Sequence, residues 1–269
     1  MNLTSPSQVK AWCIENGFHP NKVLGQNFLI DRNALEQIVD AGLKGCSESG
    51  VHVLEIGPGL GVLTEEMLKR GCKVTAIEKD PVLAARLKES LGNPEGLDVI
   101  AGDALEVLAR PSPFHPFTCM ISNLPYQAGT RILLELVQRR ELETMTVLVQ
   151  TEVAERLAAS EGSKTRGLAG VWAQLDYDVK IVRKVAASCF WPRPEIGSSV
   201  VRLDRHDRNI ELSVEERKLF HRLTKQAFEH RRKQLGSIFK DMIQSTARAE
   251  ELSNEDWIAL TKGLANENA

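Results

Sequence analysis

The sequence of 269 residues lacks the signatures of several protein classes. No apolar run is long enough to span a bilayer, and residues 1–6 lack the basic and apolar regions of a secretory signal. We therefore expect a cytoplasmic protein without a membrane partner. The five cysteines are scattered, with no Cys-x-x-Cys pair and no histidine at ligand spacing, so we expect neither a disulfide framework nor a bound metal. Such cysteines are typically small buried apolar side chains.

A large net charge is also missing. The formal net charge is −2 at pH 7, which by itself does not point to a nucleic acid, so the local distribution of charge must carry any such conclusion. Apolar residues make up 42% of the chain and charged residues 26%, as in ordinary globular proteins. The length suits one α/β domain with a smaller appendage, and we expect a monomer.

The first two thirds of the chain alternate strand-like and helix-like segments. Short apolar runs predict strands, and apolar residues at helical spacing predict the helices between them. The predicted strands are 51–56, 73–78, 98–101, 119–121 and 145–149, and the predicted helices are 33–43, 60–70, one opened by Asp80-Pro81, and 131–139. Strict alternation implies a parallel sheet covered on both faces. Two further strands, 177–185 and 198–203, have no long helix between them and would form an antiparallel edge.

A glycine-rich turn follows the first predicted strand. Residues 57–61 place three glycines where the backbone must turn tightly and approach a ligand at a helix N-terminus. The dinucleotide fingerprint needs its third glycine where Val62 stands, which disfavours a nicotinamide cofactor. Glu78 ends the second strand and can bind ribose hydroxyls, while Asp103 ends the third and can accept from an adenine amino group. Together these features predict S-adenosylmethionine as the cofactor.

The turn after strand 119–121 has the composition needed to methylate a base amine. The exocyclic nitrogen of adenine is a poor nucleophile, because its lone pair is delocalised into the ring. Asn123 supplies an acceptor, and Pro125 keeps Leu124 out of the helical region so that main-chain carbonyls can face a ligand. Tyr126 supplies a stacking face. Such a reaction needs no strong base, and none of the six histidines lies in a motif.

Positive charge concentrates in residues 216–240, where eight basic residues stand against two glutamates. Apolar residues recur there at helical spacing, so one face would pack while the other presents charge. Either this is a solvated amphipathic helix, or the charged face binds RNA phosphates. The RNA-binding candidates are Arg222, Lys225, Arg231, Arg232 and Lys233, and Lys164, Arg166, Arg193 and Arg202 would extend the surface.

Taken together, these motifs closely resemble those of the small-subunit rRNA adenine dimethyltransferase family, whose members dimethylate two adjacent adenosines in a hairpin loop near the 3′ end of the rRNA. The resemblance rests on residues 25–29, 55–61, Glu78, 102–103, 123–126, 150–157 and 190–203, and on a helical C-terminal part. It implies a Rossmann-like S-adenosylmethionine-dependent methyltransferase domain at 1–206, with segment 1–31 covering the donor. It also implies a small all-α domain at 207–269 that binds RNA or the ribosome.

The resemblance assigns roles to individual residues. The donor would contact Gln26, Asn27, Leu29, Gly57, Gly59, Glu78, Asp103 and Asn123. The target base would be held by Asn123, Leu124, Pro125 and Tyr126, with Phe190 as a second stacking wall. The implied partner is small-subunit rRNA within a pre-30S or 30S-type ribosomal particle, with a role in small-subunit maturation.

Three alternatives stay open. An NAD-dependent dehydrogenase would share the fold, but the glycine spacing and the lack of a Tyr-x-x-x-Lys pair disfavour it. A DNA or large-subunit rRNA adenine N6-methyltransferase would share the chemistry. A non-catalytic RNA-binding assembly factor would be expected to show an eroded glycine loop or a lost Asn-Leu-Pro-Tyr turn, and the sequence has both features intact.

Overall fold

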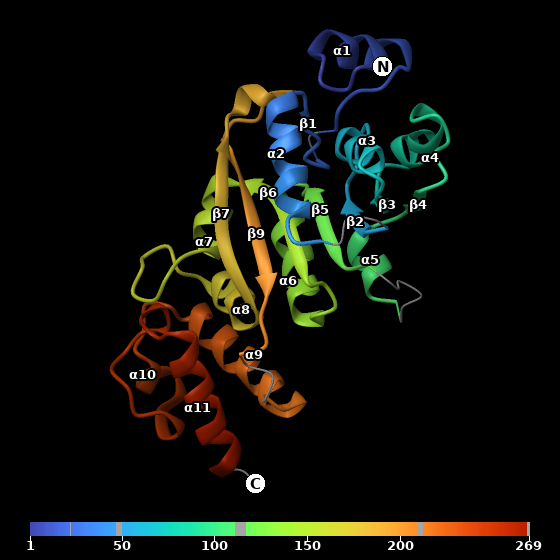
Figure 1. Ribbon diagram of the computed structural model, residues 1–269. Coiled ribbons are helices and arrows are strands. Elements are labelled where there is room, and N and C mark those ends of the chain that lie inside the picture. Colours follow the sequence, from blue (N-terminus) through green and yellow to red (C-terminus); the bar gives the residue numbers. More distant parts are fainter. Residues whose placement is uncertain (22, 47–49, 111–116, 209–211, 268–269) are drawn as a thin grey trace. The chain divides into compact units, whose positions relative to one another are not determined.

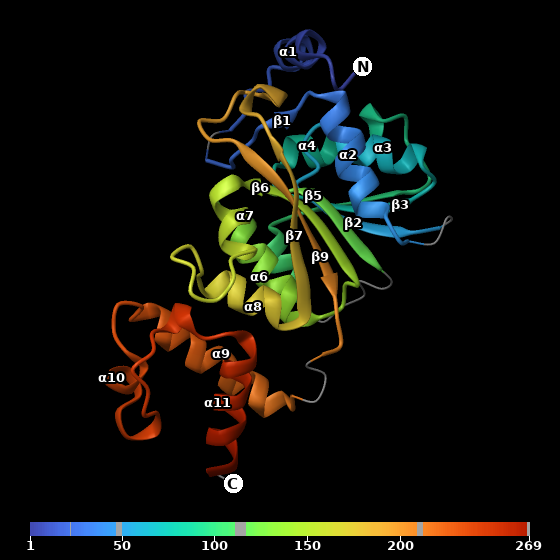
Figure 2. The same cartoon turned by 60° about the vertical axis from the view of Figure 1, so that its left-hand side comes forward.

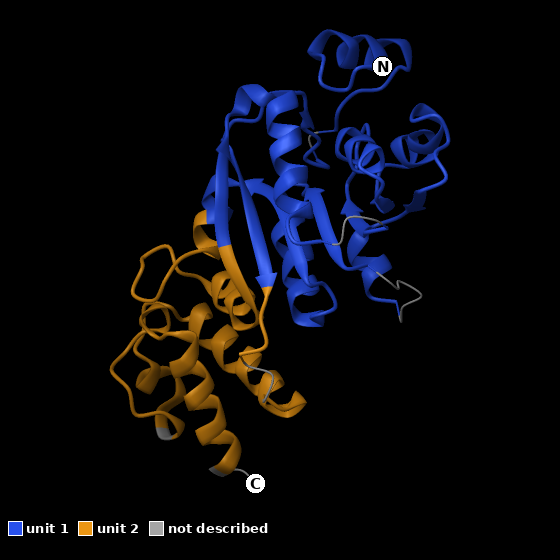
Figure 3. Ribbon diagram, viewed as in Figure 1, with its two compact units in different colours: residues 1–154, 180–204 blue, residues 155–179, 205–269 orange. Residues whose placement is uncertain are grey.

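The computed structural model describes the chain apart from residues 22, 47–49, 111–116, 209–211 and 268–269 (Figure 1). It divides into two compact units (Figure 3). The first comprises residues 1–154 and 180–204, and the second comprises residues 155–179 and 205–269. The predicted boundary after residue 206 differs from this division, because residues 155–179 join the C-terminal unit and not the sheet-containing one.

A mostly parallel sheet is the framework of the first unit. Its strand order in the described residues is β4-β3-β2-β5-β6-β9-β7. Strands β2 to β6 run parallel, and β9 pairs antiparallel with β6, with Val147 opposite Val201. The predicted fold class, a Rossmann-like sheet with an antiparallel edge, is confirmed. The bounds are β2 (His52–Ile56), β3 (Lys73–Glu78), β4 (Leu97–Ala101), β5 (Cys119–Asn123), β6 (Thr144–Gln150), β7 (Tyr177–Val185) and β9 (Ser198–Arg205).

Helices cover both faces of this sheet. Helices α2 and α3 lie together on one side and α6 lies on the other (Figure 2). Aspartates begin three of the helices, since the side chains of Asp31, Asp80 and Asp103 accept hydrogen bonds from main-chain N–H groups of the first turns of α2, α4 and α5. The bounds are α2 (Arg32–Leu43), α3 (Val62–Lys69), α4 (Pro81–Ser90), α5 (Ala104–Leu108), α6 (Gly129–Arg139) and α7 (Thr151–Leu157).

A small sheet that the sequence pattern did not predict attaches the N-terminal segment to the rest of the first unit. After α1 (Pro6–Glu15), strand β1 (Phe28–Leu29) pairs antiparallel with β8 (Phe190–Trp191), which follows the short helix η1 (Ala187–Cys189). The rings of Phe28 and Trp191 stack with centroids 6.4 Å apart. Strands of two residues carry no detectable period, which is why they escape prediction.

The second unit is helical and has its own apolar core. Helix α9 begins with a capping box, in which Ser213 Oγ accepts from Glu216 N and Glu216 Oε2 accepts from Ser213 N. Trp257 and Phe220 are fully buried in the core, and Trp172 donates to Thr224 Oγ1 at 2.9 Å, which ties α8 to α9. The elements are α8 (Leu168–Asp176), α9 (Val214–Glu229), α10 (Leu235–Phe239), η2 (Lys240–Met242), η3 (Ala249–Glu251) and α11 (Asn254–Glu267).

Candidate functional site

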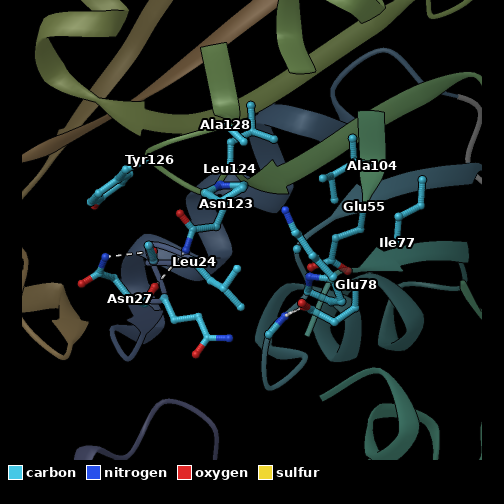
Figure 4. A pocket seen from close by; sticks show the side chains of 18 of the residues that line it. Leu24, Asn27, Glu55, Ile77, Glu78, Ala104, Asn123, Leu124, Tyr126 and Ala128 are labelled. Carbon is cyan, nitrogen blue, oxygen red and sulfur yellow. Dashed lines mark hydrogen bonds between the residues drawn. The ribbon is translucent and has the colours of Figure 1, made fainter. Parts of the chain in front are cut away.

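A cavity in the first unit lies at the carboxyl ends of β2, β3 and β5, where ligands bind in open α/β sheets (Figure 4). The N-terminal segment forms one wall through residues 23–29. All the residues predicted to contact donor and base line this cavity, apart from Phe190. They are Gln26, Asn27, Leu29, Gly57, Gly59, Glu78, Asp103, Asn123, Leu124, Pro125 and Tyr126.

The glycine turn needs its glycines for conformation and for space. Gly57, Gly59 and Gly61 have φ angles of +69°, +60° and +90°, in the left-handed region that other residues rarely adopt. A Cβ at Gly59 would lie 3.1 Å from Phe28 Cε1, and one at Gly61 would lie 2.7 Å from Leu87 Cδ1. Gly57 and Gly59 therefore offer bare backbone to a ligand, while Gly61 begins α3.

Glu78 is the buried acid of the cavity. Only 6% of its surface is exposed, and its two carboxylate oxygens accept from Gly59 N at 3.0 Å and Asp80 N at 2.8 Å. Burial raises the pKa of Glu78, and these main-chain donors oppose the rise. Each oxygen has a second lone pair, so the carboxylate keeps the capacity to accept from ribose hydroxyls.

Asp103 is held by two partners at the edge of the cavity. Oδ1 accepts from Leu105 N at 2.9 Å, and Oδ2 pairs with Lys79 Nζ at 2.8 Å. The Lys79 ammonium lowers the pKa of Asp103, so this carboxylate stays charged near neutrality. Lys79 also lines the cavity. Lys79 was not predicted as a site residue, although its position directly after Glu78 at a predicted strand end is a usable signal.

The turn after β5 holds its two polar side chains by hydrogen bonds. Asn123 Nδ2 donates to Asn27 O at 3.1 Å, which leaves the amide oxygen to face elsewhere, because a main-chain carbonyl can only accept. Tyr126 Oη lies 2.7 Å from Ser198 Oγ, and burial raises the pKa of the Tyr126 phenol. Both side chains project from the same short turn (Figure 4). Ser198, a further residue that sequence analysis did not single out, thus orients the tyrosine ring.

Phe190 does not lie where the resemblance predicted a second stacking wall. It is paired with Leu29 in the β1–β8 sheet, has 2% of its surface exposed and packs in the apolar core. It does not line the cavity. Its ring is buried in the apolar core of the first unit, which leaves almost no face for a base in this structure.

Glu55 is an acid of the cavity for which the sequence suggested no role. It is 1% exposed and its Oε2 accepts from Thr64 Oγ1 at 2.6 Å. Burial is the largest cause that raises the pKa of Glu55 to about 8, and the nearby Glu78 adds to the rise. Glu55 is therefore mostly a neutral acid at pH 7, able to donate as well as accept.

The predicted RNA-binding cations in the second unit fall into two groups. Arg222, Lys225, Arg232 and Lys233 are exposed. Arg231 instead donates to Lys164 O at 2.6 Å and lies 3.5 Å from Glu250 Oε1, so it joins parts of its own unit.

Two of the residues expected to extend the basic surface have structural partners. Arg166 is 1% exposed and donates to Ala159 O and Asn254 Oδ1, at 3.0 and 2.9 Å. Arg202 donates to Asp204 Oδ1 at 2.7 Å and to the main-chain carbonyls of Ala41, in α2, and Lys44, directly after it. Both predictions were wrong, because a buried or fully engaged guanidinium cannot reach a phosphate.

In the part of the chain that the structure describes, no group of three or more histidine, cysteine or acidic side chains is placed to hold a metal ion. Within the same residues, no helix has the length and apolar character to cross a membrane.

Comparisons with known proteins identify the family. The sequence model of the family "Ribosomal RNA adenine dimethylase" matches residues 17–267. The protein named ribosomal RNA small subunit methyltransferase A from Deinococcus radiodurans is 47% identical over 204 residues, covering 75% of this chain and 67% of that protein. The protein of the same name from Alkaliphilus oremlandii is 34% identical, with 98% of each chain covered.

Solved structures agree in fold. A dimethyladenosine transferase from Plasmodium falciparum superposes with a TM-score of 0.75 at 23% identity, covering 89% of this chain and 98% of that one. The 23S rRNA methyltransferase ErmE superposes with a TM-score of 0.67 at 24% identity, covering 89% and 100%. The family match confirms the predicted enzyme class, an rRNA adenine dimethyltransferase, and its cofactor, S-adenosylmethionine. It excludes the alternative of an NAD-dependent dehydrogenase. Because that family model matches nearly the whole chain, the chain belongs to the ribosomal RNA adenine dimethylase family.

Proposed function

We propose that this rRNA adenine dimethyltransferase acts on two adjacent adenosines in a hairpin loop near the 3′ end of small-subunit rRNA and serves small-subunit maturation. One observation carries the proposal: the glycine turn with Glu78, suited to an adenosine-containing donor, and the turn 123–126, suited to a base, line the same cavity. The names of relatives that cover nearly the whole chain support the small subunit as the source of the substrate.

The residues of the cavity suit the donor. Gly57 and Gly59 offer bare backbone for close approach, the Glu78 carboxylate would accept from the ribose hydroxyls, and the Asp103 carboxylate would accept from the adenine amino group. Asn27 and Leu29, from the N-terminal wall, would cover the bound molecule. S-adenosylmethionine supplies an electrophilic methyl group on a positively charged sulfur.

The turn 123–126 would handle the target base. An adenosine extruded from its stack would lie against the ring of Tyr126, which Ser198 keeps in place. The amide oxygen of Asn123 would accept from the exocyclic amine and favour a pyramidal nitrogen. The amine becomes acidic only after methylation and can then lose its proton to water, so no strong base is required. The product amine can react again, which allows two transfers to each base.

The exposed cations of the second unit, Arg222, Lys225, Arg232 and Lys233, would bind RNA phosphates. Their partner would be a pre-30S or 30S-type particle in the cytoplasm, engaged by a monomer of the protein. The salt dependence of RNA binding distinguishes this role from the alternative, in which the charged face of residues 216–240 is only solvated.

A methyl-transfer assay tests the proposal. Radiolabelled donor is offered with unmethylated small subunits, large subunits or duplex DNA, and modified bases are mapped by primer extension and mass spectrometry. Dimethylated adenosines at two adjacent positions of small-subunit rRNA are expected. Labelling of large subunits or of DNA alone would replace this proposal with the corresponding alternative, and donor binding without transfer to any substrate would favour a non-catalytic assembly factor.

A further inference from the structure

Gln26 lines the donor cavity, yet both ends of its side-chain amide are used within the protein. Nε2 donates to Asp80 Oδ2 at 2.9 Å, and Oε1 accepts from Asn21 N at 2.7 Å. The main chain of Gln26 also donates to Asn21 O at 3.2 Å, which holds the two ends of this loop, Asn21 and Gln26, together. The side chain therefore ties this loop to the start of α4, 54 positions away in the sequence.

Asp80 connects this tie to the acid of the donor site. It is 8% exposed, and its Oδ1 accepts from Val82 N at 2.9 Å as the N-cap of α4. Its own main-chain N–H donates to Glu78 Oε1 at 2.8 Å, and Glu78 Oε2 accepts from Gly59 N at 3.0 Å. An unbroken path of hydrogen bonds thus runs from the N-terminal wall of the cavity, through Asp80 and Glu78, to the glycine turn.

The wall held in this way is part of the ligand enclosure. Residues 23–29 line the cavity, Asn27 O accepts from Asn123, and Phe28 lies against Gly59. In the proposed donor site, this wall would cover the bound donor. Moving this wall breaks the bond between Gln26 and the Asp80 carboxylate, which is a charge-assisted hydrogen bond to a largely buried aspartate.

We infer that Gln26 and Asp80 form a latch that holds residues 23–27 over the donor cavity, with Asp80 as a positioning residue that aligns this wall with Glu78. The inference rests on the proposed donor site. It reassigns Gln26 from donor contact to latch, and it makes the latch a determinant of how long S-adenosylmethionine stays bound.

Two substitutions break the latch while leaving the helix cap in place. Asp80→Asn keeps an oxygen to cap α4, since asparagine is as good an N-cap as aspartate. Its NH2 group then faces the NH2 group of Gln26, and two donors cannot form a hydrogen bond. Gln26→Glu places a second carboxylate against Asp80. The double variant Gln26→Glu/Asp80→Asn exchanges donor and acceptor, preserves the net charge of the pair, and leaves an oxygen to accept from Asn21 N.

Two measurements test the latch. One is the dissociation rate of radiolabelled S-adenosylmethionine chased with unlabelled donor, and the other is hydrogen exchange of the amides of residues 23–29 in the donor-free protein. Each single variant is expected to raise the dissociation rate about tenfold or more and to speed exchange in this segment, as loss of a charge-assisted hydrogen bond requires. The double variant is expected to return to within about threefold of the parent, because the coupling between the two sites is restored.

The outcomes separate the latch from the donor site itself. Unchanged donor affinity in Glu78→Ala would overturn the proposed donor site. If Glu78→Ala loses the donor but Asp80→Asn releases it at the parental rate, the site stands and the latch is wrong. A double variant as defective as the single ones, with parental unfolding temperature, would also overturn the latch, since it would reduce Asp80 to a helix cap.

Discussion

The charged residues of the donor cavity and those of the basic stretch are held in different ways. In the cavity, Glu78 and Asp103 each accept from a main-chain N–H at a strand end, and their positions follow from the sheet. In the stretch 216–240, Arg232 and Lys233 are exposed, while Arg231 is drawn into contacts within its own unit. Pre-organised groups suit a small ligand that is bound in one geometry, whereas exposed cations suit a phosphate backbone that is recognised mainly by charge.

The largest expected effect is on chemistry in the cavity. Asn123→Ala removes the acceptor that strengthens as the attacked amine becomes tetrahedral, so single-turnover methyl transfer at saturating RNA and donor should fall on the order of 100-fold. Some donor affinity should also be lost, because Asn123 helps to hold Asn27 in the N-terminal wall. Transfer at the parental rate would remove this turn from the activation of the amine.

Glu78→Ala should weaken donor binding by about tenfold or more, since ribose hydroxyls lose a carboxylate acceptor worth about 1.5–3 kcal/mol per bond. Titration calorimetry with S-adenosylmethionine measures this directly. RNA affinity should stay at its parental value, which sharpens the contrast between the two regions. A matching loss of RNA affinity would mean that the variant disturbs more than the donor site.

Substitution of the exposed cations should lower RNA affinity and make that affinity less dependent on salt concentration. Arg232→Glu combined with Lys233→Glu should weaken RNA binding and flatten the slope of log affinity against log salt by about 0.9 for each lost phosphate contact, the value for duplex DNA being a guide. Arg231→Gln is the matched control and should leave the slope unchanged while lowering the free energy of unfolding. A slope unchanged in the double variant would make this stretch a solvated face.

Tyr126→Phe should have a modest effect. The stacking face remains, and only the hydroxyl bond to Ser198 is lost, worth about 1 kcal/mol. Single-turnover transfer should therefore stay within about tenfold of the parent. Tyr126→Ala, in contrast, removes a face worth about 1–3 kcal/mol and should raise the RNA concentration needed for half-maximal rate. Equal defects in both variants would assign the role to the hydroxyl and not to the ring.

The smallest effect is expected for Glu55→Gln, on the free energy of unfolding under mildly acidic conditions. The amide mimics the protonated acid that burial favours, so stability at about pH 5 should change little. The pKa of Glu55 is raised from its ordinary value to about 8, so the folded state holds a proton that the unfolded state releases. This contribution to stability is lost as pH rises toward 8, by up to about 1.4 kcal/mol per pH unit. Urea unfolding should show that the free energy of unfolding falls less steeply with rising pH in the variant than in the parent. Equal slopes in the two proteins would contradict a neutral Glu55.

The predictability of the two regions follows from the range of the interactions that build them. Short apolar runs predicted the strands from β2 to β6, and helical spacing predicted α2, α3, α4 and α6, because those patterns are local. Carboxyl ends of parallel strands meet at one edge, so the positions of Glu78 and Asp103 at predicted strand ends were enough to place both in one cavity. Ser198 was missed because its role depends on Tyr126, a partner far along the chain.

The local pattern of residues thus determined the class of sheet, the glycine turn and the Asn-Leu-Pro-Tyr turn at 123–126, since each depends on neighbours within a few positions. Tertiary packing decided the rest. It buried Phe190 in the apolar core, engaged Arg166 and Arg231 within the second unit, joined residues 155–179 to that unit, and brought Gln26 to Asp80. Amphipathic spacing shows that a side chain lies on a polar face, but only the folded chain shows whether a partner already occupies its hydrogen bonds.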